Sequence, residues 1–260
     1  MGVKLGSNFL VVPTQLVSQS TMSHCARVAL LCVQIWLFIA SAACVLQIDD
    51  CEVVIAGGST AAFAAAVASA SQGVQTCLLE PTDWVGGQLT ASGVPAVDFE
   101  WRILKSGDRQ YNIARIDKLR ENVTPNFYSL LRAVGDMGRC WVSNYCFLPR
   151  DVINKGLLPL QQQVSQFLRV FENTLVKRVK VENGRVLSLD AVQRVVKPGT
   201  KCNGYDQLLS DAVSDWYSET ESARFTKKIL QFGGTNLPIF MDATDWGDIL
   251  ALSDMDYLQA

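Results

Sequence analysis

The feature that most constrains the fold is a strand, a glycine turn and a helix that follow one another directly. Residues Glu52–Ala56 (EVVIA) form a short β-branched run, typical of a parallel strand that is buried on both faces. Gly57-Gly58 follow at once, and the alanine-rich segment Thr60–Gln72 then has a high helix propensity. Gln75–Leu79 (QTCLL) forms a second apolar run. This order predicts a right-handed βαβ crossover, and therefore an α/β fold around a parallel sheet.

The turn in this unit, Gly57-Gly58-Ser59-Thr60-Ala61-Ala62, occupies the place of the G-x-G-x-x-G nucleotide-binding fingerprint. The first glycine permits the tight turn, and Ser59 stands where a middle glycine normally lets the backbone approach a pyrophosphate. Glu80 follows 23 residues after Gly57, at a strand end where a carboxylate accepts hydrogen bonds from ribose hydroxyls. A solvated glutamate is the alternative. The spacing favours a dinucleotide site, and the acidic residue disfavours NADP because its extra phosphate would be repelled.

The segment 52–98 (EVVIAGGSTAAFAAAVASASQGVQTCLLEPTDWVGGQLTASGVPAVD) resembles the opening of FAD-dependent oxidoreductases of the glutathione-reductase-like superfamily, in the branch that includes xanthan-lyase-like proteins. The resemblance continues into a predicted hairpin and up to the sequence DATDWGD. It implies FAD as the cofactor, with Gly57, Gly58, Ser59, Thr60, Ala61 and Glu80 at the nucleotide. It also implies a loop over the flavin formed by Gly86, Gly87, Gln88, Leu89 and Thr90, an adenine contact at Val176, and further cofactor contacts from Asp242, Ala243, Thr244 and Asp248.

Further along the chain, Thr174–Val181 and Arg185–Val195 alternate between apolar and polar residues and are separated by Glu182-Asn183-Gly184, which predicts a hairpin. Leu237–Met241 is another predicted strand. Apolar residues recur at helical spacing in two segments, and one polar segment is interpreted as an insertion or long loop. The helical segments are Asn126–Val134 and Leu158–Phe171, and the polar one is Lys197–Arg224.

These elements predict a Rossmann-like FAD/NAD(P)-binding domain with a β-hairpin or meander crossover and a partial second region. The nucleotide-binding core is expected at residues 51–95 and 172–253. The inserted part of a substrate region is expected at 96–171, within a domain that spans 47–260.

An apolar run near the amino terminus, Val28–Val45, follows Arg27 and ends in small residues. The pattern is typical of a signal peptide, with cleavage expected near Ser41–Cys44, so residues 1–46 are assigned to this segment. An uncleaved signal anchor is the alternative, because the run nearly reaches the length of a membrane span. Either interpretation predicts export from the cytoplasm, and the second predicts a membrane tether.

Cysteine usage is consistent with an oxidising compartment. Cys140 and Cys146 are the best candidates for a disulfide, with two unbonded thiols as the alternative. Cys77 is interpreted as a buried strand residue.

Charge and histidine content exclude several classes of function. The formal net charge is −2 and no long basic run occurs, so we expect no nucleic-acid partner. The single histidine, His24, precedes all segments that look folded, so we expect neither an imidazole base nor a metal site.

The sequence therefore predicts an FAD-dependent oxidoreductase whose small-molecule substrate it does not identify. Because members of the family usually continue past DATDWGD, a truncated homologue that binds FAD without turnover is one alternative. A secreted carbohydrate-active, lyase-like protein is another.

Overall fold

The computed structural model describes residues 45–97, 124–135, 146–234 and 236–256. These residues belong to the second of two units in the chain, Cys44–Ala260. The part of the predicted signal segment that precedes Val45 lies outside the described residues, and so does its expected cleavage site at Ser41–Cys44. Cys140 also lies outside them. Among the residues that are described, no helix is both long and apolar enough to cross a membrane.

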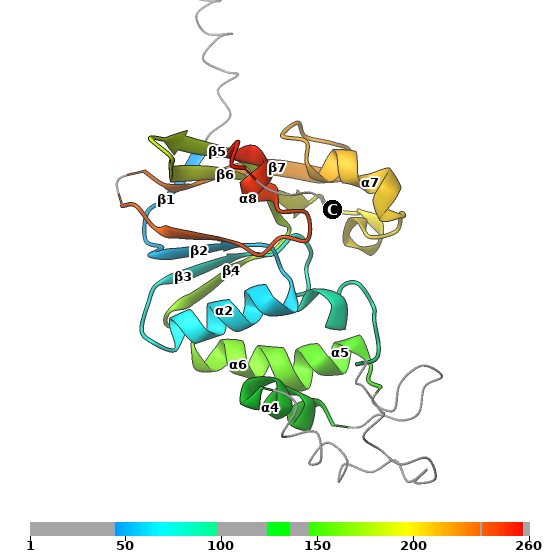
Figure 1. Cartoon of the computed structure of the whole chain (residues 1–260). Coiled ribbons are helices and arrows are strands. Elements are labelled where there is room, and N and C mark those ends of the chain that lie inside the picture. Colours follow the sequence, from blue (N-terminus) through cyan, green and yellow to red (C-terminus); the bar gives the residue numbers. More distant parts are fainter. Residues whose placement is uncertain (1–44, 98–123, 136–145, 235, 257–260) are drawn as a thin grey trace, which may run out of the picture. The chain divides into compact units, whose positions relative to one another are not determined.

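The second unit contains two four-stranded sheets (Figure 1). The elements are, in chain order, β1 (Val45–Ile48), β2 (Val53–Ala56), α2 (Thr60–Ala70), β3 (Thr76–Leu79), the 3-10 turn η1 (Gly87–Leu89), α4 (Pro125–Val134), α5 (Pro149–Asp151), the π-helical turn η3 (Val152–Leu157), α6 (Leu158–Gln163), β4 (Leu168–Phe171), β5 (Thr174–Glu182), β6 (Arg185–Val196), the 3-10 turn η4 (Lys201–Gly204), α7 (Leu209–Trp216), β7 (Phe225–Gly233), β8 (Ile239–Asp242) and α8 (Asp248–Leu252).

The first sheet is fully parallel, with the strand order β4-β3-β2-β8. The strand–helix–strand unit predicted from the sequence forms its centre as β2, α2 and β3, which confirms the α/β fold class. The second sheet has the order β1-β7-β6-β5, in which β5, β6 and β7 form an antiparallel meander and β1 pairs in parallel with β7.

The parallel sheet is buried on both faces, as its β-branched sequence predicts. Alternate residues of β2 face opposite sides, so Val53 and Ile55 pack with the helices, while Val54 and Ala56 pack against the second sheet. Figure 1 shows the same three layers, with α2, α4, α5 and α6 on one side of the parallel sheet and the meander on the other. The middle layer therefore holds its strand ends rigidly, which makes them suitable for positioning a site.

The predicted hairpin is confirmed as β5 and β6. Asn183 and Gly184 connect the strands with φ angles of 52° and 71°, a left-handed pair that matches the twist of a two-residue hairpin. The third strand of the meander, β7, was not predicted from the sequence. The segment Lys197–Arg224, predicted to be an insertion or loop, lies between β6 and β7 and contains the helix α7.

The prediction of helical periodicity over Leu158–Phe171 is wrong in its second half. The helical segment runs earlier, from Pro149 to Gln163, and residues Leu168–Phe171 form β4 instead. The physical reason is tertiary: β4 adds a parallel neighbour to β3, and Leu168 enters the core beneath α2. Four residues at a sheet edge are too few to give a strand period that differs clearly from a helical one.

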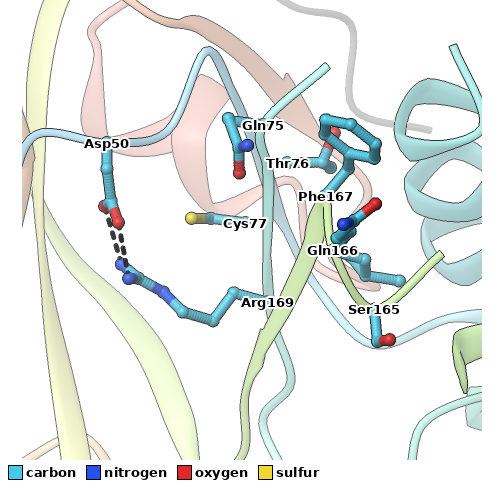
Figure 2. A pocket seen from close by; sticks show the side chains of 9 residues that line it. Asp50, Gln75, Thr76, Cys77, Ser165, Gln166, Phe167 and Arg169 are labelled. Atoms are coloured by element: carbon cyan, nitrogen blue, oxygen red, sulfur yellow. Dashed lines mark hydrogen bonds and ion pairs between the residues drawn. The ribbon is translucent and has the colours of Figure 1, made fainter. Parts of the chain in front are cut away.

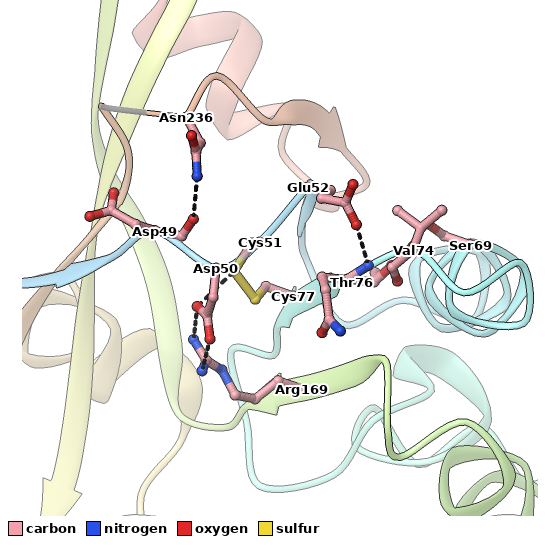
Figure 3. The surroundings of a disulfide bond; sticks show 11 residues. Asp49, Asp50, Cys51, Glu52, Ser69, Val74, Thr76, Cys77, Arg169 and Asn236 are labelled. Atoms are coloured by element: carbon pink, nitrogen blue, oxygen red, sulfur yellow. Dashed lines mark hydrogen bonds and ion pairs between the residues drawn. A yellow bond between two sulfur atoms is a disulfide. The ribbon is translucent and has the colours of Figure 1, made fainter.

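A disulfide joins Cys51 to Cys77, with 26 residues of sequence separation (Figure 3). The interpretation of Cys77 as a buried strand residue is correct for its position in β3 but misses this bond. Cys146 is also disulfide-bonded. Because Cys140 lies outside the described residues, the pairing predicted for these two cysteines stays a prediction.

Candidate cofactor-binding site

The carboxyl ends of β2, β3 and β8 lie together at one edge of the parallel sheet. The chain leaves β2 on one side toward β3 and reaches β8 on the other, so the strand order reverses between β2 and β8. In open α/β sheets, ligands bind outside the carboxyl ends of the strands at such a switch point. Gly57 follows β2, Glu80 follows β3 and Ala243 follows β8, so sequence-predicted residues from three separate segments meet there.

Gly57 brings the first of these segments against the third. Its φ is +104°, a conformation that favours glycine, and a Cβ placed there would lie 2.3 Å from the Ala243 carbonyl oxygen and 2.6 Å from the Thr244 nitrogen. The Ala243 N–H donates to the Ala56 carbonyl at 2.8 Å, which extends the β2–β8 pairing to the turn itself. The glycine is therefore required by close backbone contact.

Ser59, the departure from the fingerprint, caps the helix α2. Its Oγ accepts a hydrogen bond from the Ala62 N–H at 3.1 Å and donates to the Ala243 carbonyl at 3.1 Å. Among the described residues no acceptor faces the first N–H groups of the helix, those of Thr60 and Ala61. The helix start thus keeps the N–H groups and the positive dipole end that bind phosphate, although the middle glycine is replaced.

Gly58 lies directly against the carboxylate of Glu80. A Cβ at Gly58 would lie 1.7 Å from Glu80 Oε2, so a side chain at this position would displace the carboxylate. Glu80 is only 2% exposed. Its Oε1 accepts hydrogen bonds from the N–H and the hydroxyl of Thr82, both at 2.7 Å. Its Oε2 is buried and has no hydrogen-bond partner in the described part of the chain.

Burial raises the pKa of Glu80 to about 7, from an ordinary value of 4.5. Two neighbouring acids, Glu172 and Asp83, raise this pKa further, while the two bonds from Thr82 lower it. A buried carboxylate oxygen without a donor is costly, and the described residues supply none. The unpartnered Oε2 therefore points to donors that arrive with a ligand.

The loop predicted to cover a flavin packs on the start of α2. Gly86 donates its N–H to the Gly58 carbonyl at 2.9 Å, and Thr60 Oγ1 donates to the Gly86 carbonyl at 2.8 Å. A Cβ on Gly87, whose φ is +54°, would lie 2.9 Å from Ser59 Cα. The buried side chains of the loop are those of Leu89, in the helical core, and Thr90, whose hydroxyl donates to the Val85 carbonyl at 2.6 Å. Gln88 is exposed beside them.

A hydrogen-bonded turn follows β8. Asp242 Oδ1 accepts from the Thr244 N–H at 3.1 Å and from its hydroxyl at 2.7 Å, and Oδ2 accepts from the Leu250 N–H. Thr244 Oγ1 accepts in turn from the Asp248 N–H at 2.8 Å. Asp248 receives a hydrogen bond from the Tyr217 hydroxyl, and burial is the main reason that the pKa of Asp248 is raised. This turn fixes the backbone that meets Gly57.

Val176 lies apart from the polar cluster. Its side chain is buried with Val54, Ala56 and Leu79 between the two sheets. A contact between this residue and an adenine would therefore have to come from its backbone.

Two groups near the site escaped the sequence analysis. Thr82, which binds Glu80, is a threonine two residues after an acid, a spacing typical of local side-chain hydrogen bonds. Arg194 reaches the same turn from β6, where it is buried between the half-buried Gln193 and the exposed Val195. Neither this burial nor the partner of Arg194 could be inferred from sequence.

A hollow of about 240 Å³ lies at the opposite end of the sheet (Figure 2). Thr76 and Leu168, at the starts of β3 and β4, line it together with Asp50 and Arg169. Asp50 and Arg169 form a two-bond ion pair there. The hollow is smaller than most ligand pockets and lies at the amino ends of the strands, so it is separate from the cluster described above.

Comparison with known proteins identifies one matching family. A model of the FAD dependent oxidoreductase family matches residues 52–259. No curated protein matches the chain.

Solved structures also align with parts of the chain. Sdh1 of Mycobacterium smegmatis, in complex with UQ1, is 13% identical over 80% of this chain and 38% of its own, with a TM-score of 0.42. A geranylgeranyl bacteriochlorophyll reductase-like protein of Thermoplasma acidophilum is 12% identical over 82% of this chain and 44% of its own, with a TM-score of 0.41. The chain thus spans less than half the length of either structure.

Proposed function

The chain belongs to the FAD-dependent oxidoreductase family, and on this premise we propose that it binds FAD across the carboxyl ends of β2, β3 and β8 and acts as an oxidoreductase. The observation that carries the proposal is the buried Oε2 of Glu80, which has no donor among the described residues. A ribose hydroxyl of the adenosine would supply that donor. The residues present therefore fit an adenine dinucleotide.

The remaining residues of the cluster fit the other parts of the cofactor. The N–H groups of Thr60 and Ala61 would bind the pyrophosphate at the start of α2. The loop Gly86–Thr90 and the turn Asp242–Asp248 would lie along the route toward the isoalloxazine. When bound, the isoalloxazine supplies the hydride or electron transfer.

The protein's own contribution is to bind and orient the cofactor and to hold or release one proton at the Glu80 carboxyl. Near pH 7 the flavin-free protein holds a proton on Glu80 in about half of the molecules, because the pKa of this carboxyl is about 7. Donors from a ribose would favour the ionised carboxylate and lower this pKa, so binding would release the proton. Gly57 and Gly58 keep the backbone close enough for these contacts.

The visible absorption spectrum of purified residues 45–260 tests the proposal. A flavin spectrum that is lost on Glu80→Ala or Gly57→Val supports it. A folded, colourless protein that takes up no added FAD would overturn it. Flavin that is bound but never reduced by any electron donor tried would favour the alternative of a non-catalytic FAD-binding protein.

Two finer assignments belong to the same proposal. The sequence of the flavin-loop region supports placement in the branch that includes xanthan-lyase-like proteins. The Cys51–Cys77 disulfide and the bonded Cys146 support export, because stable disulfides are typical of oxidising compartments. Amino-terminal sequencing of secreted protein tests export and cleavage together; a mature start before Val28 would contradict the signal-peptide assignment.

A further inference from the structure

Arg194, in β6, is a buried charge whose role the proposed FAD site does not yet explain. Its side chain is 2% exposed, and it forms no ion pair with a carboxylate in the described part of the chain. Nη2 donates to the Pro81 carbonyl at 2.6 Å, while Nε and Nη1 are buried without hydrogen-bond partners among the described residues. Burying a guanidinium in this way is costly, so a compensating role is expected.

Aromatic rings hold this guanidinium in place. The Arg194 Cζ lies 4.1 Å from the centre of the Trp216 ring and 5.7 Å from that of Phe225. Trp216 ends α7, within the segment between β6 and β7, and its burial depends on Ala212 and Tyr205. Burial lowers the pKa of Arg194, but an arginine remains charged at physiological pH. The inserted segment therefore supplies a platform for a fixed, charged side chain.

The contacts of Arg194 converge on the turn that carries Glu80. Pro81, the acceptor of Nη2, directly follows Glu80. The backbone N–H of Arg194 also donates to the Asn173 carbonyl, at 2.9 Å. Asn173 in turn donates its N–H to the Thr82 carbonyl at 2.8 Å. Arg194 therefore bridges the two backbone segments between which Glu80 is held.

A tyrosine from the inserted segment strengthens this bridge. The hydroxyl of Tyr205 donates to Asn173 Oδ1 at 2.6 Å, and Arg194 Nη2 approaches the same oxygen at 3.4 Å. The Asn173 backbone has a φ of +55°, a conformation that an asparagine tolerates better than most residues. The hydrogen bonds to the Asn173 side chain thus stabilise its left-handed backbone conformation.

We propose that Arg194, held against Trp216, is a positioning residue of the cofactor site, which fixes the Glu80–Thr82 turn so that the carboxylate meets the ribose of FAD. The proposal rests on the proposed function. It assigns the inserted segment between β6 and β7 a role in cofactor affinity, although that segment need not touch the cofactor.

Arg194→Lys tests the proposal in the full chain, because lysine keeps the charge but lacks the planar fork that reaches Pro81 while stacking on Trp216. Arg178→Lys is the matched control. Arg178 is an exposed arginine of the same meander, where it pairs with Asp190 and Glu219. We expect the Kd for FAD to rise about 10-fold in Arg194→Lys and less than about 2-fold in the control, since only the former alters a buried hydrogen bond to the turn that carries Glu80.

The pH dependence of FAD binding distinguishes positioning from general stability. In the wild type the affinity for FAD should decrease as the pH is lowered below about 7, because Glu80 takes up its proton there. Thr82, Asp83 and Glu172 face the same carboxyl. In Arg194→Lys the Glu80–Thr82 turn should become more exposed to water. The pH midpoint of FAD binding should therefore move down toward 4.5, the ordinary pKa of a glutamate. Tyr205→Phe, which removes the hydroxyl that bonds to Asn173 and interacts with Arg194, should move this midpoint in the same direction, and it keeps the test available if Arg194→Lys does not fold.

An unchanged Kd for FAD in both Arg194→Lys and Tyr205→Phe would overturn the proposal. A weaker Kd with the midpoint still near pH 7 would also overturn it, because that result assigns Arg194 a purely structural role. If wild type and Arg178→Lys both fail to bind FAD, the proposed function itself is wrong and this inference falls with it. If both bind, the proposed function stands whatever Arg194→Lys does.

Discussion

Replacing Glu80 with glutamine should make the flavin-free protein less sensitive to pH while weakening its affinity for FAD. The carboxyl is 2% exposed and its pKa is raised to about 7 by burial, from an ordinary value of 4.5. The folded state therefore binds the Glu80 proton more tightly than the unfolded state does. Stability from this group is fully present below about pH 4.5 and is lost as the pH rises through about 7.

The size of the effect follows from these two pKa values. The difference of about 2.5 corresponds to about 3.4 kcal/mol at about 1.36 kcal/mol per pKa unit. Between pH 5 and pH 8, about 2.5 kcal/mol of the free energy of unfolding should be lost. Glutamine does not titrate, so Glu80→Gln should lack this share of the loss.

Urea unfolding of flavin-free wild type and Glu80→Gln at pH 5 and pH 8 measures the difference directly. Comparing the two proteins cancels other groups whose pKa is raised, such as Glu172 and Asp248. Glu172→Gln serves as the control, because that acid is exposed beside the same turn and should change the slope much less. Identical pH dependence in wild type and Glu80→Gln would refute the assigned burial of the carboxylate.

Three further perturbations have defined outcomes. Gly58→Ala should weaken FAD binding about 10- to 100-fold in a fluorescence titration, because the added Cβ would lie 1.7 Å from Glu80 Oε2 and would displace the carboxylate. An unchanged affinity would contradict this contact. The double variant Cys51→Ala/Cys77→Ala should lose about 3.5 kcal/mol of stability in denaturant, as expected for a 26-residue separation, and a loss below about 1 kcal/mol would exclude a stabilising crosslink. Ser59→Ala should cost about 1 kcal/mol through the lost helix cap, and the same unfolding assay would count against the cap if stability did not change.

The centre of the fold was predictable because its signals are local. The β-branched run of β2, the alanine-rich helix α2 and the glycine turn between them each act within a few residues, and the structure contains them in the predicted order. The Asn183-Gly184 turn fixed the hairpin in the same way. Each of these signals can be read without knowing a partner that is distant in sequence.

The elements that escaped prediction depend on partners distant in sequence. Strand β4 is defined by its pairing with β3, and four residues carry no periodic signal of their own. The Cys51–Cys77 bond depends on how β2 and β3 align, which the spacing of cysteines does not reveal. Sequence placed Glu80 at a strand end, but its unpartnered oxygen and the bridge from Arg194 arise only from packing.

The most direct test of the central claim pairs the Glu80 carboxylate with the ribose hydroxyl it is proposed to bind. The Kd of FAD and of an FAD analogue without the 2′-hydroxyl on its adenosine ribose would be measured on wild type and on Glu80→Ala. We expect the missing hydroxyl to weaken binding about 10-fold or more on wild type, and less than about 2-fold on Glu80→Ala, because only the former has a charged acceptor. Equal losses on both proteins, or no loss on wild type, would contradict the account.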